Sequence, residues 1–191
     1  MEPNHPPMRL SGVGPVSVGR EQHLELISDG GKTPVAVDFG SFFADNRAPI
    51  TKALAMTLRD DQLGADAMAE GMARAYQRWD DVGRYANPSG WVYRVGLNWA
   101  RSRRRKWARE VFRSESPDSE ASPAPEVDPA LDEALAALPV EQRSVVVLRY
   151  LLDWSEFQTA EALEIAPGTV KSRLSRALER LAVALENPHD T

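Results

Sequence analysis

A proline-rich acidic stretch, Ser114–Pro129 (SESPDSEASPAPEVDP), divides this chain of 191 residues. It holds four prolines and five acidic residues, and Val127 is its only large apolar residue. Such a composition has too little apolar surface to offset the conformational entropy lost on folding. We therefore expect residues 113–128 to form a flexible acidic linker between two small domains, residues 38–112 and 129–187.

Apolar residues recur at helical spacing on both sides of this linker, and no stretch shows a strong alternation with the period of two that is typical of strands. Before the linker, one helix is expected to bury a face made of Leu63, Met68, Met72, Ala75, Tyr76 and Trp79. A second is expected to bury an arc of about 100° made of Trp91, Val92, Val95 and Trp99. The predicted fold class is therefore all-α. Residues 1–37 are rich in proline and glycine, and we expect a disordered N-terminal extension of unexplained role.

The residue inventory excludes several classes of function. The chain has no cysteine, and its three histidines (His5, His23 and His189) lie near the termini, so we expect no metal site, no cofactor, no small-molecule substrate and no enzymatic activity. No apolar run is long enough to cross a membrane, and the N-terminus lacks a secretory signal pattern. These features predict a cytoplasmic protein without membrane insertion.

The charge is unevenly distributed, and this unevenness indicates an anionic partner. The net charge is -5, yet residues 38–112 carry 13 positive and 9 negative groups, with five cations among the six residues Arg101–Lys106. On a helix, Arg94, Asn98, Arg101 and Arg105 would lie beside the tryptophan arc, with Trp107 outside it. This arrangement favours a phosphate-binding surface. A basic face that contacts only solvent is the alternative.

The segment Trp154–Leu181 (WSEFQTAEALEIAPGTVKSRLSRALERL) has the spacing of a helix-turn-helix. Ala160 stands where two helices would cross, Glu164 stands at the turn where a left-handed conformation is expected, and Pro167 suits a first helical turn. The second helix would present donors suited to phosphates and to base edges in the major groove, namely Thr169, Lys171, Ser172, Arg173, Ser175 and Arg176. The alternative is an ordinary helical hairpin whose basic face contacts water.

Four motifs together resemble the extracytoplasmic-function (ECF) group of bacterial sigma factors, in the sigma-70 family. "LP..QR.V..LRY" and "GTVKSRL.RA" resemble region 4 of that family, and "AEGMARAYQRW" with "GWVYRVGLNWARSRRR" resembles region 2. The resemblance covers residues 39–112 and 130–186. It implies a region 2 helical bundle and a region 4 helix-turn-helix, and it implies a protein that binds core RNA polymerase and promoter DNA, helps to melt the promoter, and is controlled by an anti-sigma factor.

The resemblance also implies roles for particular residues. Region 4 would bind the -35 element through the six residues of the second helix given above. Region 2 would bind the -10 element through a loop that holds a flipped base and through the following helix, with Tyr85, Asn87, Ser89, Arg94, Asn98, Arg101, Arg104 and Arg105. Core polymerase would bind Asp66, Glu70, Arg74 and Arg78, for which an ordinary solvent-facing surface is the alternative.

Two questions stay open at the level of sequence. The acidic linker could enter a basic channel of the polymerase, or it could be a passive tether. A free-standing DNA-binding regulator, dimeric on paired half-sites, is the competing class of function. Such a regulator would bind its operator alone, whereas a sigma factor would need core polymerase.

Overall fold

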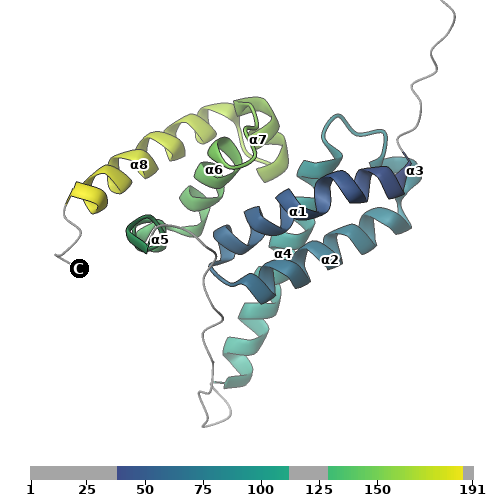
Figure 1. Cartoon of the computed structure of the whole chain (residues 1–191), viewed down its shortest axis with the longest axis horizontal. Coiled ribbons are helices and arrows are strands. Elements are labelled where there is room, and N and C mark those ends of the chain that lie inside the picture. The colour runs from purple at the N-terminus through teal and green to yellow at the C-terminus, as the bar shows by residue number, and fades with distance from the viewer. Residues whose placement is uncertain (1–37, 112–128, 187–191) are drawn as a thin grey trace, which may run out of the picture. The chain divides into compact units, whose positions relative to one another are not determined.

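A computed structural model describes residues 38–111 and 129–186, and every regular element in these two ranges is a helix, as the sequence predicts (Figure 1). The expected N-terminal extension and linker lie outside the described residues. None of the described helices is both long and apolar enough to cross a membrane. The helices, in chain order, are α1 (Phe39–Leu58), α2 (Asp61–Gln77), α3 (Trp79–Val82), α4 (Pro88–Val111), α5 (Pro129–Ala137), α6 (Val140–Tyr150), α7 (Glu156–Leu163) and α8 (Pro167–Glu186).

The break between α1 and α2 falls where charged residues interrupt the apolar pattern. Arg59 ends α1 in a left-handed conformation, with φ 53° and ψ 50°. Asp60 then caps α2, because its carboxylate accepts a hydrogen bond of 2.8 Å from the amide of Leu63. A side-chain acceptor at this position satisfies one of the amides that have no partner inside a helix. The short charged stretch therefore reverses the chain and brings α2 alongside α1.

Helix α2 approaches α1 and α4 closely because it carries small residues on its buried side. A Cβ atom added to Gly64 would lie 2.6 Å from the Cα of Ala55, and one added to Gly71 would lie 2.7 Å from the carbonyl oxygen of Val92. Tyr76, which we predicted on the buried face of α2, is instead 67% exposed, so this part of the prediction is wrong. Hydropathy gives glycine little weight, although its missing side chain allows the closest helix contacts.

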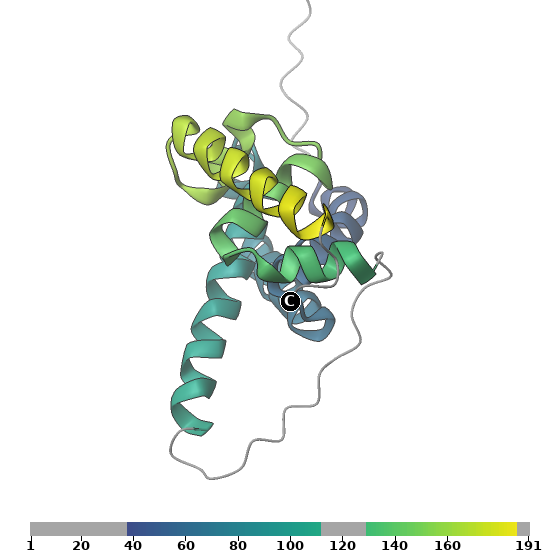
Figure 2. The ribbon, with the colours of Figure 1, turned by 90° about the vertical axis from the view of Figure 1, so that its left-hand side faces the viewer.

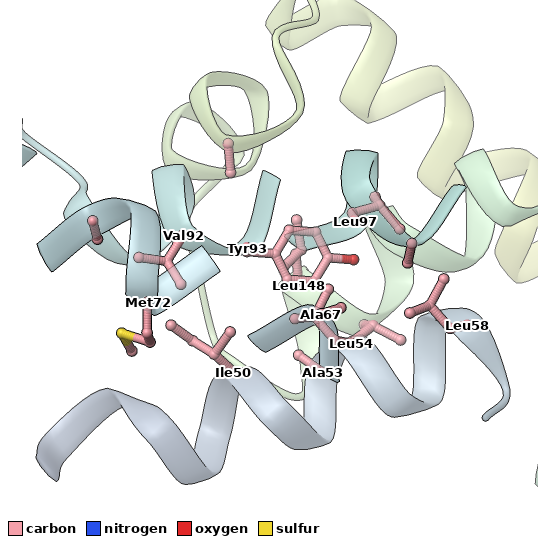
Figure 3. Packing of buried hydrophobic residues seen from close by; sticks show 14 of the residues in the cluster. Ile50, Ala53, Leu54, Leu58, Ala67, Met72, Val92, Tyr93, Leu97 and Leu148 are labelled. Atoms are coloured by element: carbon pink, nitrogen blue, oxygen red, sulfur yellow. The ribbon is translucent and has the colours of Figure 1, made fainter. Parts of the chain in front are cut away.

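The buried strip of α4 also differs from the predicted arc. Val92, Tyr93 and Leu97 are buried (Figure 3), and so is Ala100. Trp91 and Trp99 are only partly buried and pack at the edge of the core. Gly96 lies within the buried strip, and a Cβ there would meet the carbonyl oxygen of Ala67 at 2.5 Å. The buried side of α4 is therefore turned about the helix axis away from the tryptophans, because the closest contact between helices is made where the side chains are small, at Gly96 and Ala100. Trp107 is 49% exposed, as predicted.

Helices α6 and α7 complete the core that α1, α2 and α4 begin. Val147 and Leu148 of α6 and Ala162 of α7 belong to the same buried cluster as Leu54 and Tyr93, and Figure 3 shows Leu148 next to residues of the first helices. All eight helices accordingly fall within one compact unit. The division into two domains at residues 113–128 stays a prediction, while the contact between the two groups of helices is an addition that the sequence did not reveal.

Helices α7 and α8 form the predicted helix-turn-helix. Val145, Ala160 and Val170 make a small separate core, which confirms the expected helix crossing at Ala160. Ser155 and Gln158 form a reciprocal capping box at the start of α7. Glu164 ends α7 with φ 52° and ψ 45°, the predicted left-handed conformation, and α8 begins at Pro167.

Helix α6 begins at Val140, and Pro139 is its N-cap residue, with φ -55° and ψ 144°. An N-cap residue keeps an extended backbone, and the fixed φ of proline suits this conformation as well as the first helical turn. The buried side of α6 is made of Arg143, Ser144 and the four apolar residues Val145–Leu148.

The buried guanidinium of Arg143 joins the α5–α6 corner to α1. Its Nε donates to the carbonyl oxygen of Leu135 at 2.7 Å, and its Nη2 donates to those of Ala136 at 3.1 Å and Leu138 at 2.7 Å. Its Nη1 donates to the carbonyl oxygen of Thr57 at 3.0 Å. Burial lowers the pKa of Arg143 below its usual value, but an arginine stays protonated at neutral pH. One side chain therefore supplies hydrogen-bond donors to the carbonyl groups at the end of α5 and in the last turn of α1.

Replacing this guanidinium tests how much the corner depends on it. We expect Arg143→Met to lower the free energy of unfolding by about 3 kcal/mol, because several buried carbonyl groups would lose charged hydrogen-bond donors. Chemical denaturation followed by circular dichroism would measure the loss. Arg180→Met is the matched control, since Arg180 is exposed and makes one 3.4 Å hydrogen bond, to Gln142. Equal effects of the two substitutions would contradict the role of Arg143.

Candidate nucleic-acid interface

The first turns of α8 present a cationic surface that no described residue neutralises. Val170 and Ala177 are buried, while Lys171 and Arg176 are exposed and Arg173 is half-buried. Among the described residues, these three cations make no ion pair and no side-chain hydrogen bond. Their charges are therefore available to an anionic ligand.

The hydroxyl groups of the same helix are partly engaged within it. Ser172 donates to the carbonyl oxygen of Thr169 at 3.1 Å, and Ser175 donates to Glu179 at 3.0 Å. Both hydroxyls retain acceptor capacity. A Cβ added at Gly168 would meet nothing within 4 Å, so the start of the helix is open to an approaching surface. All six residues predicted for this surface thus lie on the first half of α8.

The second half of α4 carries the basic cluster into solvent. This half extends away from the other helices in both views (Figure 1, Figure 2). Neighbouring groups hold some of its cations in position: Arg104 donates to the carbonyl oxygen of Leu58 at 2.8 Å, and Arg105 donates to Ser102 at 2.9 Å. The guanidinium of Arg103 lies over the ring of Trp99, 5.2 Å from its centre. These contacts hold a dense positive charge on an exposed helix.

The loop before α4 is held by hydrogen bonds that the sequence analysis missed. Asn87 caps α4, because its Oδ1 accepts a hydrogen bond of 2.8 Å from the amide of Gly90. Ser89 donates to Oδ1 of Asn46, on α1, at 2.6 Å. Asn87 is buried, and of the three predicted loop residues only Tyr85 is exposed, by 42%. An Asn one residue before Pro88 is a recognisable N-cap signal, so this role could have been found in the sequence.

Two of the predicted -10 cations are paired with carboxylates of the later helices. Arg94 Nη1 lies 2.9 Å from Glu164, and Arg101 Nη2 lies 2.9 Å from Glu141. Asn98, in contrast, is exposed. The structure thus places all the predicted residues on α4 and its preceding loop, but it leaves only some of them accessible. No sequence pattern indicated these pairs, because the partners are 70 and 40 residues apart.

The predicted polymerase-binding residues follow one ridge of α2. Glu70 and Arg74 form an ion pair of 2.7 Å one turn apart, and Asp66 accepts a hydrogen bond of 3.1 Å from Gln62. Arg78 is exposed at the end of the helix. The ion pair and the hydrogen bonds of these side chains all lie within α2. The ridge is therefore a mixed-charge surface that no other helix engages through these groups.

The described residues include neither a candidate metal centre nor an accessible group with a shifted pKa. Within residues 38–111 and 129–186, no group of three or more His, Asp or Glu side chains could hold a metal ion. Tyr93 is fully buried, and its burial raises the pKa of the hydroxyl despite hydrogen bonds with Thr57 and Ser144. This tyrosine is therefore neutral at physiological pH and serves the core. The exposed cations and hydrogen-bond donors of α4 and α8 suit the binding of a polyanion such as DNA.

Comparison with known proteins identifies the family. The family model "Sigma-70, region 4" matches residues 129–181. The ECF RNA polymerase sigma factor SigL of Mycobacterium tuberculosis is 36% identical over 152 residues, which cover 74% of this chain and 86% of that protein. The RNA polymerase sigma-E factor of Streptomyces antibioticus is 38% identical over 128 residues, covering 63% of this chain and 69% of that one.

A solved structure agrees with these relatives. The sigma factor RpoE from Bartonella quintana, crystallised in complex with the anti-sigma factor NepR, has a TM-score of 0.68 and 25% identity to this chain. The match covers 78% of this chain and 97% of that one. The sequence relatives, the matched region 4 and this shared fold all lead to the same conclusion: the chain belongs to the ECF family of RNA polymerase sigma factors.

Proposed function

We propose that this sigma factor directs core RNA polymerase to particular promoters through α8 and α4 and assists promoter melting. The observation that carries the proposal is the pair of cationic helices in one chain of this family. Helix α8 has cations that pair with no described residue, and α4 has a dense exposed cluster. Phosphate attraction supplies affinity, and donors at base edges supply sequence preference. The chain would act as a binding subunit and not as an enzyme, in the cytoplasm where promoters and polymerase are found.

The -35 element would be bound by α8. In helix-turn-helix proteins the first residues of the second helix contact base edges in the major groove. Here these residues include Arg173 and Arg176, whose guanidinium groups can donate two hydrogen bonds to guanine, and Lys171, which suits a phosphate. Thr169, Ser172 and Ser175 would add short-range donors. The absence of ion pairs on the three cations, among the described residues, supports this assignment.

The -10 element would be bound by the loop before α4 and by α4 itself. A flipped base needs hydrogen bonds to its edge and a surface for stacking. Asn87 and Ser89 have the polar groups, and Tyr85 has an exposed ring. The cations Arg94, Arg101, Arg104 and Arg105, with Asn98, would contact the backbone of the separated strands. The exposed end of α4 supports this part of the proposal most directly.

Core polymerase would bind the ridge of α2 formed by Asp66, Glu70, Arg74 and Arg78. The domain division proposed from the sequence would let residues 38–112 and 129–187 contact two promoter elements on the same DNA. Residues 113–128 would then connect them, as a tether or as an acidic segment inside the polymerase. The RpoE relative was crystallised with an anti-sigma factor, and we propose that a protein of this kind also binds this chain.

Transcription in vitro tests the proposal as a whole. Core polymerase with the purified chain should initiate RNA at defined sites in a library of promoters, whereas neither component should do so alone. The 5′ ends of the transcripts would identify the promoters. A chain that binds a palindromic operator as a dimer and forms no complex with core polymerase would instead be a free-standing regulator.

Substitutions in α8 test the -35 contact. Arg173→Ala or Arg176→Ala should weaken promoter binding by the holoenzyme by about 1–3 kcal/mol if the guanidinium contacts a base, and should relax the preference at one -35 position. Binding to a set of -35 variants would measure both effects. Arg180→Ala, farther along the same helix, is the control. A loss that is uniform across all sequences would mean that the arginine contacts only phosphate.

A substitution that preserves the helix cap tests the role of Asn87. Asn87→Ser removes the side-chain amide but keeps an oxygen that can cap α4, so the free energy of unfolding should change little. We expect promoter opening, followed by permanganate reactivity, to fall more than closed-complex binding. Asn87→Ala removes both functions and should also lower stability by about 1 kcal/mol. Equal loss of opening and of closed binding in Asn87→Ser would contradict the flipped-base role.

A further inference from the structure

The loop before α4 is tied to α1 by two hydrogen bonds that have a fixed direction. The side-chain amide of Asn46, on α1, donates through Nδ2 to the carbonyl oxygen of Phe42 at 2.8 Å. A carbonyl oxygen only accepts, so this bond identifies the nitrogen of the Asn46 amide and leaves its oxygen for Ser89. The Oγ atom of Ser89 lies 2.6 Å from that oxygen, Oδ1 of Asn46. The hydroxyl of Ser89 is therefore the donor in this bond.

The direction of this bond decides what Ser89 can offer to a ligand. A serine hydroxyl has one hydrogen and two lone pairs. Because Oδ1 of Asn46 accepts the hydrogen, the lone pairs are what remains for another partner. Ser89 is half-buried and not enclosed in the core. On this loop Ser89 is therefore a hydrogen-bond acceptor and not a donor.

Asn87, two residues earlier, has the opposite character. Its Oδ1 accepts a hydrogen bond of 2.8 Å from the amide of Gly90 and so caps α4. The rest of its amide group is Nδ2, which only donates. This nitrogen lies 3.5 Å from the carbonyl oxygen of Gln158, a long and weak contact that a closer acceptor can replace. The loop thus presents an acceptor at Ser89 beside a donor at Asn87.

An acceptor beside a donor matches one class of base edge. A flipped base is read by hydrogen bonds to the edge that it uses for pairing. On that edge adenine and cytosine present an amino group next to a ring nitrogen that accepts, whereas guanine and thymine present a carbonyl group next to a ring N–H. That N–H lies beside a carbonyl oxygen, which would approach the oxygens of Ser89 and Asn46. An amino group projects beyond the ring and meets an acceptor without this repulsion.

We propose that Asn46 is a positioning residue that makes Ser89 an acceptor, so that the loop before α4 selects a flipped adenine or cytosine over guanine and thymine. The inference rests on the proposed -10 role of this loop. Asn46 does not contact the base and acts through Ser89. The bonds that set this polarity all lie within α1, α4 and the loop before α4, so the preference does not depend on the later helices.

Bases with reversed polarity provide the main test. Hypoxanthine has the shape of adenine, but a carbonyl group replaces the amino group and an N–H replaces the ring acceptor, and uracil differs from cytosine in the same way. Core polymerase with the full chain would be titrated with fork-junction DNA that carries each of these four bases, in turn, at every single-stranded non-template position of the -10 element. At one position we expect the reversed bases to bind about tenfold more weakly. The tighter of adenine and cytosine there identifies the natural base.

Two substitutions of Asn46 separate polarity from packing. Asn46→Asp and Asn46→Ala both remove the bond to the carbonyl oxygen of Phe42, but only Asn46→Asp keeps an acceptor for Ser89. We expect Asn46→Asp to keep the base preference, although its charge weakens the binding of every base alike. In Asn46→Ala the hydroxyl of Ser89 is free to donate, so the preference should fall below about threefold. Thr51→Ala removes a similar bond of α1, from Thr51 to the carbonyl oxygen of Arg47 at 2.7 Å, and is the control that should keep the preference.

Four results would overturn the proposal. Two concern the bases: equal binding of the amino and carbonyl bases at every position, or a preference for the carbonyl bases at the position that Ser89→Ala affects. Two concern Asn46: an undiminished preference in Asn46→Ala, or an equal loss of preference in Asn46→Asp and Asn46→Ala. The last result would mean that Asn46 only supports the packing of the loop.

A second variant decides the matter if Asn46→Ala loses its helical circular dichroism. Ser89→Ala removes the acceptor and leaves the bond from Asn46 to Phe42 in place, so the base preference should disappear in this variant, and a full preference would contradict the proposal. Failure of the proposed function has a separate signature. In that case core polymerase and the natural chain would produce no transcript from any promoter, whichever base the -10 element carries.

Discussion

Helix α4 is the element on which the rest of the structure depends, because one side of it is buried in the core and the other carries a dense positive charge. Val92, Tyr93, Leu97 and Ala100 are buried on the side of α4 that faces α1, α2 and α7, which fixes the rotation of the helix about its axis. The cations at 94, 101, 104 and 105 are consequently directed away from the centre of that core. Gly96 allows the backbone to approach Ala67, so that even the Cβ atom of an alanine at this position would force the basic helix to shift.

The sequence predicted what depends on local spacing, and it missed what depends on contacts between distant residues. The helix-turn-helix, its crossing at Ala160 and the left-handed Glu164 followed from periodicity and turn chemistry. The buried side of α4 was misplaced because tryptophan dominates a hydropathy count, whereas Gly96 and Ala100 set the actual contact. The pair of Arg94 and Glu164 could not be predicted, since a charge on a helix face does not indicate which partner it meets.

The same limit applies to the candidate site. Motif resemblance placed all the proposed DNA-binding residues on α8, on α4 and on the loop before it, where the structure has them. It could not show that Asn87 is buried as a helix cap, or that Asn46 holds Ser89 through a hydrogen bond of 2.6 Å. Accessibility is a property of the packed chain. The assignment of α8 is therefore supported by free cations, whereas the assignment of the loop before α4 requires a change of conformation.

That requirement gives a physical reason for the unfavourable residue at the turn of the helix-turn-helix. A glutamate in the left-handed conformation costs about 1–2 kcal/mol relative to an ordinary helical residue, and glycine would avoid most of this cost. Glycine, however, would provide no carboxylate, and it is the carboxylate of Glu164 that lies 2.9 Å from Arg94. A local rule is thus broken at the position where α7 meets the end of α4 for which we propose -10 binding. Departures of this kind are expected at sites where function opposes local stability.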